Sequence, residues 1–125
     1  MFKPRLIAYL EESKFKTKIQ EIAELKKIDI CFATQGDQLS QLAKTYVPFL
    51  MLIDLSGLDA GWLFRHISIL KNMRPNFPIC VVVPEEQESI KARAEKYGCD
   101  KIITQSELIK EFPNIIENAF RKTSL

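Results

Sequence analysis

The chain has 125 residues, and its 18 Lys and Arg against 16 Asp and Glu give a formal net charge of +2. With 46% hydrophobic and 27% charged residues it has the composition of a globular protein, and its length suits a single domain over residues 1–125 with a real hydrophobic core. The basic residues are scattered and form no aromatic-interleaved stripe of the kind that binds nucleic acid, so we expect no direct contact with nucleic acid. No segment has membrane-spanning length or a signal-peptide pattern. We therefore expect a cytoplasmic protein that does not contact a membrane.

In the first part of the chain, short apolar runs alternate with amphipathic stretches. Runs at 6–10, 28–33 and 49–54 are predicted to be strands. Apolar residues at helical spacing predict a helix over 13–27 after the first strand. A short helix around Leu39, Leu42 and Ala43 follows the second strand, and a helix over 60–73 follows the third.

The second part of the chain repeats this alternation. The almost wholly apolar run 79–83 predicts a fourth strand, and 85–97 predicts a charged helix that Gly98 ends as its C-terminal cap. A fifth strand is predicted over 101–104, and Ser106 is a good N-cap for a turn of helix. Pro113 suits the first turn of a final helix that reaches about residue 121, because proline lacks the N–H that a helix interior needs.

Five strands alternating with five helices predict an α/β fold of three layers, a parallel sheet covered on both faces. In such doubly wound sheets the functional groups collect beyond the carboxyl ends of the strands. Asp54 ends the third strand there, and Glu11 and Glu12 follow the first. Carboxylates that meet at one edge attract a hard cation such as Mg²⁺ and argue against a flavin or a nucleotide phosphate.

The three cysteines, Cys31, Cys80 and Cys99, are too few and too widely spaced for a disulfide framework or a metal ribbon. Cys31 and Cys80 lie inside apolar runs. We therefore expect them to be small buried hydrophobic residues in a reducing compartment.

The chain resembles the receiver domains of two-component response regulators, the CheY-like family, over essentially its whole length. The resemblance lies in the order of strands and helices, an acidic step after the first strand, Asp54 at the end of the third, and the runs 77–83 and 97–104. It implies a flavodoxin-like sheet with the strand order 2-1-3-4-5. It also implies that Asp54 is the residue that accepts a phosphoryl group from a histidine kinase.

Other positions depart from the receiver pattern and mark a degenerate, or pseudo-receiver, site. Receivers carry two acids after the first strand. Helix phase places these at Leu10 and Glu11, and a register one residue later places them at Glu11 and Glu12. The Ser or Thr that ends the fourth strand is Val83 here, and the Lys after the fifth strand is Gln105. An amide brings no charge to a phosphoryl dianion, so these changes weaken phosphoryl transfer.

Two functions from different classes remain. The first is an atypical receiver in two-component-type signal transduction that is no enzyme, requires no cofactor and acts by protein–protein interaction without phosphorylation. Its partner would be a signalling protein, a histidine kinase or a second copy, bound on the surface of the fourth helix, fifth strand and fifth helix. The alternative is a phosphoryl-accepting receiver with a divalent metal, Mg²⁺, held by Glu11, Glu12 and Asp54. Asp54 also has a purely structural interpretation, as a hydrogen-bonded carboxylate or one paired with Gln105.

Overall fold

The computed structural model describes residues 5–10, 13–33, 38–46, 48–54, 60–73, 78–83 and 88–124. At its centre is a five-stranded parallel sheet in the order β2-β1-β3-β4-β5, so the predicted fold class and strand order are confirmed. The strands are β1 (Arg5–Tyr9), β2 (Asp29–Phe32), β3 (Leu50–Asp54), β4 (Ile79–Val83) and β5 (Lys101–Thr104). The helices are α1 (Ser13–Leu25), α2 (Gln38–Tyr46), α3 (Ala60–Met73), α4 (Glu88–Lys96) and α5 (Gln105–Ser124).

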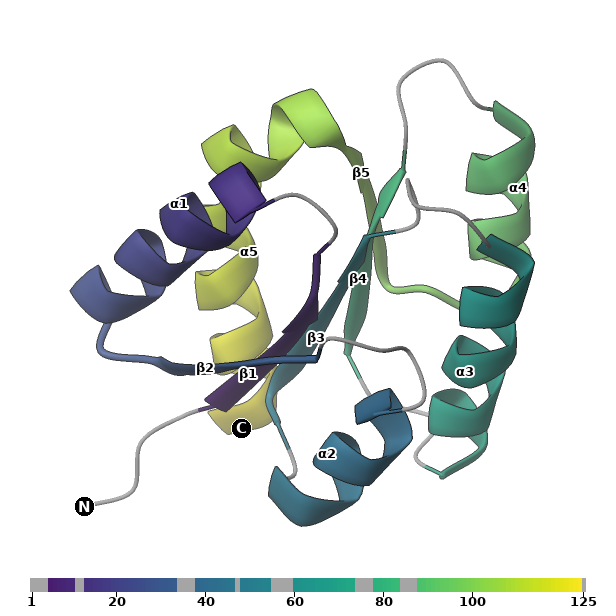
Figure 1. The fold of residues 1–125 in the computed structure, drawn as a ribbon, viewed down its shortest axis with the longest axis horizontal. Coiled ribbons are helices and arrows are strands. Elements are labelled where there is room, and N and C mark those ends of the chain that lie inside the picture. The colour runs from purple at the N-terminus through teal and green to yellow at the C-terminus, as the bar shows by residue number, and fades with distance from the viewer. Residues whose placement is uncertain are drawn as a thin grey trace.

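The helices cover both faces of the sheet, which gives the three predicted layers. Figure 1 shows α1 and α5 on one side of the strands and α3 and α4 on the other. The α2 helix joins the α3 and α4 side, where its buried residues Leu39 and Ala43 belong to the same hydrophobic cluster as those of α3.

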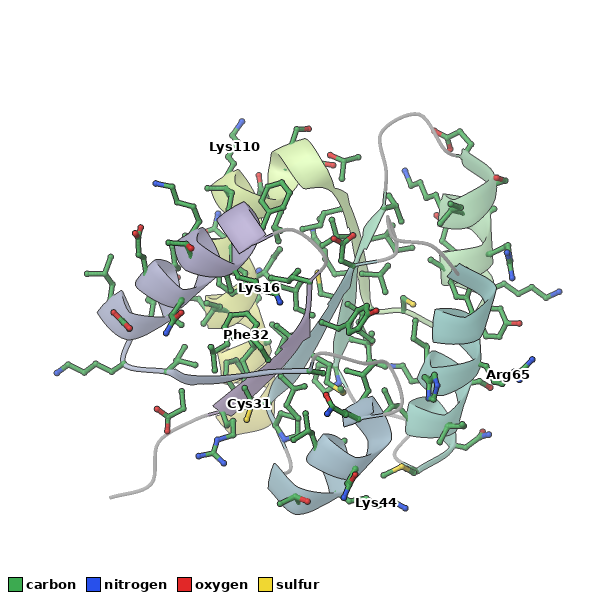
Figure 2. The ribbon with its side chains drawn as sticks, viewed as in Figure 1. Lys16, Cys31, Phe32, Lys44, Arg65 and Lys110 are labelled. Carbon is green, nitrogen blue, oxygen red and sulfur yellow. The ribbon has the colours of Figure 1, made fainter. Side chains whose placement is uncertain are left out.

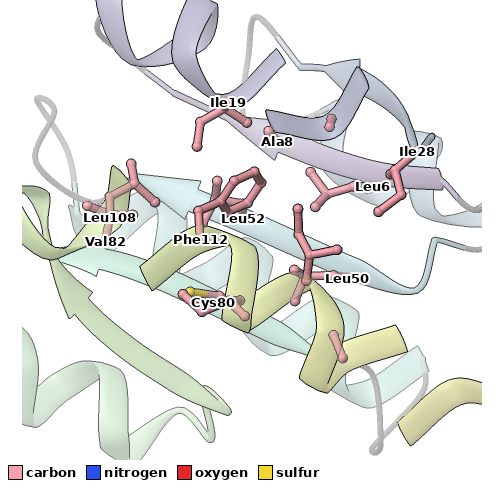
Figure 3. Close-up of a cluster of buried hydrophobic side chains, with 14 of the residues drawn as sticks. Leu6, Ala8, Ile19, Ile28, Leu50, Leu52, Cys80, Val82, Leu108 and Phe112 are labelled. Atoms are coloured by element: carbon pink, nitrogen blue, oxygen red, sulfur yellow. The ribbon is translucent and has the colours of Figure 1, made fainter. Parts of the chain in front are cut away.

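Alternate residues of each strand supply the two cores, because successive side chains of a strand point to opposite faces. All five residues of β3 and of β4 are buried, as their unbroken apolar runs predicted for strands in the middle of a parallel sheet. Figure 3 shows the core on the α1 and α5 side, where Phe112 of α5 lies among residues of the sheet. The strand residues of this core are Leu6, Ala8, Leu50, Leu52, Cys80, Val82 and Ile103.

Gly98 caps the C-terminus of α4, as predicted. Gly98 has φ +84°, its N–H donates to the carbonyl oxygen of Glu95 at 3.1 Å, and the N–H of Cys99 donates to that of Ala94 at 3.3 Å. These two bonds form the Schellman motif, in which a left-handed residue satisfies the last carbonyls of a helix.

The α1 helix ends in the same motif, with a lysine where α4 has glycine. Lys27 has φ 58°, and its N–H donates to the carbonyl oxygen of Glu24 at 3.1 Å. The N–H of Ile28 donates to the carbonyl oxygen of Ala23 at 2.9 Å. A side chain in this conformation is strained, so Lys27 is held there by its surroundings.

The position predicted for Pro113 is wrong, because this proline lies inside α5 and not in a first turn. The two helical stretches predicted on either side of it form one helix of 20 residues. Pro113 cannot donate the helical hydrogen bond to Ile109, and an interior proline costs about 3 kcal/mol. Burial of each large apolar side chain is worth about 1.5–3 kcal/mol, which outweighs that cost over the whole helix. Among the α5 residues whose side chains the structure describes, the buried ones are Leu108, Phe112, Ile115, Ile116 and Ala119.

Candidate functional site

Asp54 ends β3 and is almost completely buried, with 1% of its surface exposed. It is the only polar or charged residue in the buried class among the residues that the structure describes. Burial of a carboxylate is costly unless other groups stabilise it. The sequence therefore singled out a residue whose surroundings differ from those of every other described acid.

The neighbours of Asp54 across the sheet are apolar. Val82 is its register partner on β4. On the other side, Tyr9 of β1 pairs with Ile53, so Leu10 comes level with Asp54 one residue beyond that pair. Leu10 is 3% exposed and packs into the core on the α1 and α5 side, the same core that Val82 joins. The carboxylate is thus flanked by two aliphatic side chains.

Val83, where receivers are expected to carry a hydroxyl, ends β4 and is 3% exposed. It belongs to the core on the opposite face of the sheet, with Ile79 and Val81. An isopropyl group in that position can neither donate a hydrogen bond nor hold a charged oxygen.

A hydroxyl does lie beside this position, on Thr104, which pairs with Val83 in the β4 and β5 register. This hydroxyl donates to the Oε1 atom of Glu107 at 2.8 Å, and the N–H of Thr104 donates to the same oxygen at 3.0 Å. In return, the N–H of Glu107 donates weakly to the Thr104 oxygen at 3.4 Å. The proton of the Thr104 hydroxyl is therefore donated within the first turn of α5 and not to Asp54.

Thr104 and Glu107 form a capping box, which corrects the prediction of Ser106 as the N-cap. Glu107 is the third residue after Thr104, which is the spacing that this motif requires. The hydrogen bonds from the backbone N–H and the side chain of Thr104 hold the pKa of Glu107 below its usual value. Ser106 lies inside the first turn, where its hydroxyl is 3.2 Å from that of Thr104.

Gln105, at the position of the receiver lysine, is the first residue of α5 and follows β5 without a loop. Its side chain lies outside the described atoms. The capping box fixes the backbone on both sides of it. A pairing of Gln105 with Asp54 stays a prediction.

The predicted metal ligands Glu11 and Glu12 lie outside the described residues. Within the described ranges, no three His, Cys, Asp or Glu side chains are grouped as a metal ion requires. Leu10 cannot bind a cation, so the described neighbours of Asp54 do not by themselves fit Mg²⁺. The metal set Glu11, Glu12 and Asp54 stays a prediction.

Two of the three cysteines have thiols that burial keeps protonated. Cys80 is fully buried, as expected, whereas Cys31 and Cys99 are half-buried. Burial raises the pKa of Cys80 to about 12 and that of Cys99 to about 11. Both therefore carry a neutral thiol at neutral pH, and the thiolate is the reactive form.

A surface cavity of about 320 Å³ lies at the other end of the molecule. Its lining includes Ala23 and Lys27 near the end of α1, and Asp29 at the start of β2. Asp54 stands at the carboxyl end of a strand parallel to β2, so this cavity and the candidate site are at opposite edges of the sheet. None of the described helices is both long and apolar enough to cross a membrane.

Comparison with known proteins finds relatives by structure alone. No family model matches the chain, and no curated protein does. The receiver domain of the Francisella response regulator 1452 is 21% identical and has a TM-score of 0.79, with 97% of this chain and 99% of that chain covered. The signal receiver domain of an HD domain-containing protein from Pseudomonas fluorescens Pf-5 is 12% identical, with a TM-score of 0.81 and 97% of each chain covered.

A third similar structure is a CheY-like protein, tadZ, from Pseudomonas aeruginosa PAO1. It is 13% identical, with a TM-score of 0.80 over 94% of this chain and 99% of that chain. In all three the likeness extends over nearly the full length of both chains at low sequence identity. The chain therefore has the fold of the response-regulator receiver domains, the CheY-like fold.

Proposed function

We propose that this protein is an atypical receiver that signals through protein–protein interaction without being phosphorylated. The observation that carries the proposal is the burial of Asp54 between Leu10 and Val82, together with the burial of Val83 in the opposite core. Phosphoryl transfer depends on positioned charges and donors around the transferred group. In the register that helix phase favours, Leu10 replaces an acid, while Val83 replaces a hydroxyl and Gln105 a lysine. Neither Leu10 nor Gln105 carries a charge, and the Val83 side chain has no hydrogen-bonding group.

The magnitude of the loss supports this proposal. Removal of one oxyanion donor costs about 2.7–4 kcal/mol of transition-state stabilisation. Val83 and Gln105 together replace two such groups. The nearby hydroxyl of Thr104 does not compensate, because it donates to Glu107. A receiver with these replacements would accept phosphoryl groups too slowly to switch.

Intact-mass measurement after incubation with acetyl phosphate and Mg²⁺ tests the proposal. The wild-type chain is expected to gain no phosphoryl group, while an ordinary receiver in the same buffer does. The double variant Val83→Thr and Gln105→Lys restores the hydroxyl and the ammonium group of an ordinary receiver. It tests whether the fold around Asp54 can support phosphoryl transfer once these two groups are present. A phosphoryl adduct on the wild-type chain that disappears in Asp54→Asn would sink the proposal.

That outcome would favour the second candidate function, a phosphoryl-accepting receiver. The position of Asp54 supports it, since a buried carboxylate persists at the mouth of an otherwise apolar strand. In that case Asp54 would accept the phosphoryl group, and Glu11, Glu12 and Asp54 would hold the Mg²⁺ that shields its charge.

For the interaction itself, we propose the face of α4, β5 and α5 as the surface that binds a signalling protein, a histidine kinase or a second copy. Exposed residues of this face include Lys91 and Lys101, whose charges both act on the carboxylate of Glu107. A partner isolated by cross-linking should be retained by Asp54→Asn and lost by the pair Lys91→Glu and Lys101→Glu. Loss in Asp54→Asn alone would contradict phosphorylation-independent binding.

A further inference from the structure

The contact between α3 and α4 is built on one buried aromatic ring. Phe64 of α3 is fully buried. The Tyr97 ring, just after α4, stacks on it with centroids 5.0 Å apart and an interplanar angle of 16°. The guanidinium of Arg93, one turn earlier on α4, lies 4.8 Å from the centroid of the same ring. Arg93 and Tyr97 therefore face α3, and both also remain exposed.

Two more cations are sequence neighbours of the residues in this contact. Arg65 follows Phe64 directly, and Figure 2 shows it projecting outward from α3. Lys96 precedes Tyr97 and is three residues from Arg93, so Lys96 and Arg93 are neighbours on the surface of α4. Both Arg65 and Lys96 are exposed.

Exposed apolar side chains also occur on these two helices. Among the described residues three large hydrophobic side chains are exposed, and two of them belong to these two helices or directly follow them, Ile69 of α3 with 42% of its surface and Tyr97, just after α4, with 37%. Ile69 is four residues after Arg65 and is therefore its neighbour on α3. The third, Leu25, ends α1. We define the α3–α4 basic surface as Arg65, Ile69, Arg93, Lys96 and Tyr97.

The positive charge of this surface is not neutralised by the acids that the structure describes. The ion pairs of the described residues join Arg5 to Asp29, Lys26 to Glu117 and Lys71 to Asp100, and none of them takes up a cation of the surface. On α4, Glu95 follows Arg93 by two residues and therefore points to the opposite side of the helix.

We propose that the α3–α4 basic surface docks an acidic segment of a partner protein that also carries apolar side chains. The three cations complement acidic side chains, and Ile69 and Tyr97 offer apolar area to the rest of the segment. Arginine and tyrosine are among the residues that most often dominate protein interfaces. Arg93, held over Phe64, is already ordered before a partner arrives, which lowers the entropic cost of binding.

A nucleic acid fits this surface less well. The whole chain carries only +2 and has a pI of about 8.4, below the range of nucleic-acid-binding domains. An exposed isoleucine beside the cations adds nothing to the binding of phosphates.

This surface differs from the α4, β5 and α5 face, because it uses the side of α4 that turns toward α3. The inference does not depend on whether Asp54 accepts a phosphoryl group. Its failure would leave the proposed function untouched.

The test measures, by anisotropy at low salt, the binding of a fluorescent peptide composed of glutamate and leucine. The charge variant carries Arg65→Glu and Lys96→Glu, both at exposed positions, and leaves Arg93 on its aromatic contact. Its matched control carries Lys18→Glu and Lys110→Glu, two exposed lysines on α1 and α5 with the same change of net charge. These two helices lie on the other side of the sheet (Figure 1).

A second pair of variants tests the apolar part of the surface. Ile69→Ser removes an exposed apolar side chain from it, and Leu25→Ser removes an exposed one from the end of α1. Thermal melting monitors that all four variants fold.

We expect the charge variant to bind the peptide at least about tenfold more weakly than the wild type, and its control to bind within about threefold of it. Ile69→Ser should weaken binding by about threefold and Leu25→Ser should leave it unchanged. Amide chemical shifts of the wild type should move in α3 and α4 upon peptide addition.

Equal weakening by the charge variant and its control would overturn the proposal, because only net charge would then matter. No binding by the wild type, or tighter binding of duplex DNA at matched charge, would overturn it as well. Equal effects of Ile69→Ser and Leu25→Ser would overturn the apolar part of the proposed recognition.

Discussion

Replacement of Asp100 by alanine is expected to lower the free energy of unfolding, because Asp100 links α3 to the sheet. Asp100 precedes β5, and its Oδ2 atom accepts hydrogen bonds from Lys71 Nζ at 2.7 Å and from the N–H of Ile79 at 2.9 Å. The N–H of Asp100 donates to the carbonyl oxygen of Ile79, also at 2.9 Å. One carboxylate thereby ties the end of α3 to the start of β4.

The size of this destabilisation follows from the interactions that Ile79 and Lys71 lose. The Ile79 N–H would be left without its acceptor in a partly buried place, at a cost of about 1–3 kcal/mol. The ion pair adds about 0.5–1 kcal/mol, since the Asp100 side chain is 42% exposed and solvent screens it. Asp100→Ala should therefore lower the free energy of unfolding by about 2–3 kcal/mol. Asp100→Asn keeps an oxygen acceptor and should lower it by about 0.5–1 kcal/mol.

Urea unfolding followed by circular dichroism measures these differences. The variant Lys71→Met removes the ion pair and leaves the bond to Ile79, so it should resemble Asp100→Asn. A double-mutant cycle between Lys71→Met and Asp100→Asn isolates the ionic coupling, expected at about 0.5–1 kcal/mol. Equal destabilisation by Asp100→Asn and Asp100→Ala would refute the reasoning, because the bond to Ile79 would then carry no part of the effect.

Three further predictions concern the caps and the thiols. Thr104→Ala removes the N-cap of α5 and should cost about 0.5–2 kcal/mol in urea unfolding, whereas Thr104→Ser should cost far less. Lys27→Gly should stabilise the protein by about 0.5–1 kcal/mol, and Gly98→Ala should destabilise it by a similar amount, since both positions have a left-handed backbone. No atom lies within 4 Å of a Cβ built at Gly98, so the cost there comes from the backbone conformation alone. Changes of the same sign in the two variants would contradict this prediction. The raised pKa values of Cys80 and Cys99, about 12 and about 11, favour the protonated thiols in the folded state, so their contribution to stability is complete below about pH 8.5 and is lost as the pH rises toward these values. Unfolding free energies at stepped pH should fall more steeply for the wild type than for a variant with both thiols replaced by alanine.

Much of the fold could be predicted because the central strands are apolar on both faces. The runs that became β3 and β4 have no polar alternation, and a parallel sheet covered on both faces buries such runs completely. Gly98 was predictable for a related reason, since one residue type strongly prefers its backbone conformation. Lys27, which adopts a similar conformation, gave no such signal because lysine rarely does.

One error arose where tertiary contacts outweigh local preference, and the other arose where a local capping motif was overlooked. Pro113 was placed in a first turn by its missing N–H, but the apolar face of α5 on either side of it packs continuously against the sheet. Ser106 was taken as the cap because serine is a good one. Thr104 takes that place because Glu107 stands three residues later and returns the hydrogen bond.

The candidate site was predictable only in part. Asp54 was recognised from its place at the end of an apolar strand, and its burial follows from the same run. The α3–α4 basic surface gave no signal in the sequence, because Arg65 is separated from Arg93 and Lys96 by a whole strand. The packing of Phe64 against Tyr97 and Arg93 joins the two helices that carry these cations.

The burial of Leu10 and Val83 in opposite cores bears on how readily evolution could reverse these replacements. A carboxylate at position 10 would enter the packed core between the sheet and the α1 and α5 helices, and a hydroxyl at position 83 would enter the other core. Each substitution alone would bury a polar group without the hydrogen-bonding and charged partners that a complete phosphoryl site would provide, and would therefore lower stability. A descendant of this sequence could regain the acid and the hydroxyl only through less stable intermediates. Leu10 and Val83 are therefore difficult to reverse one at a time.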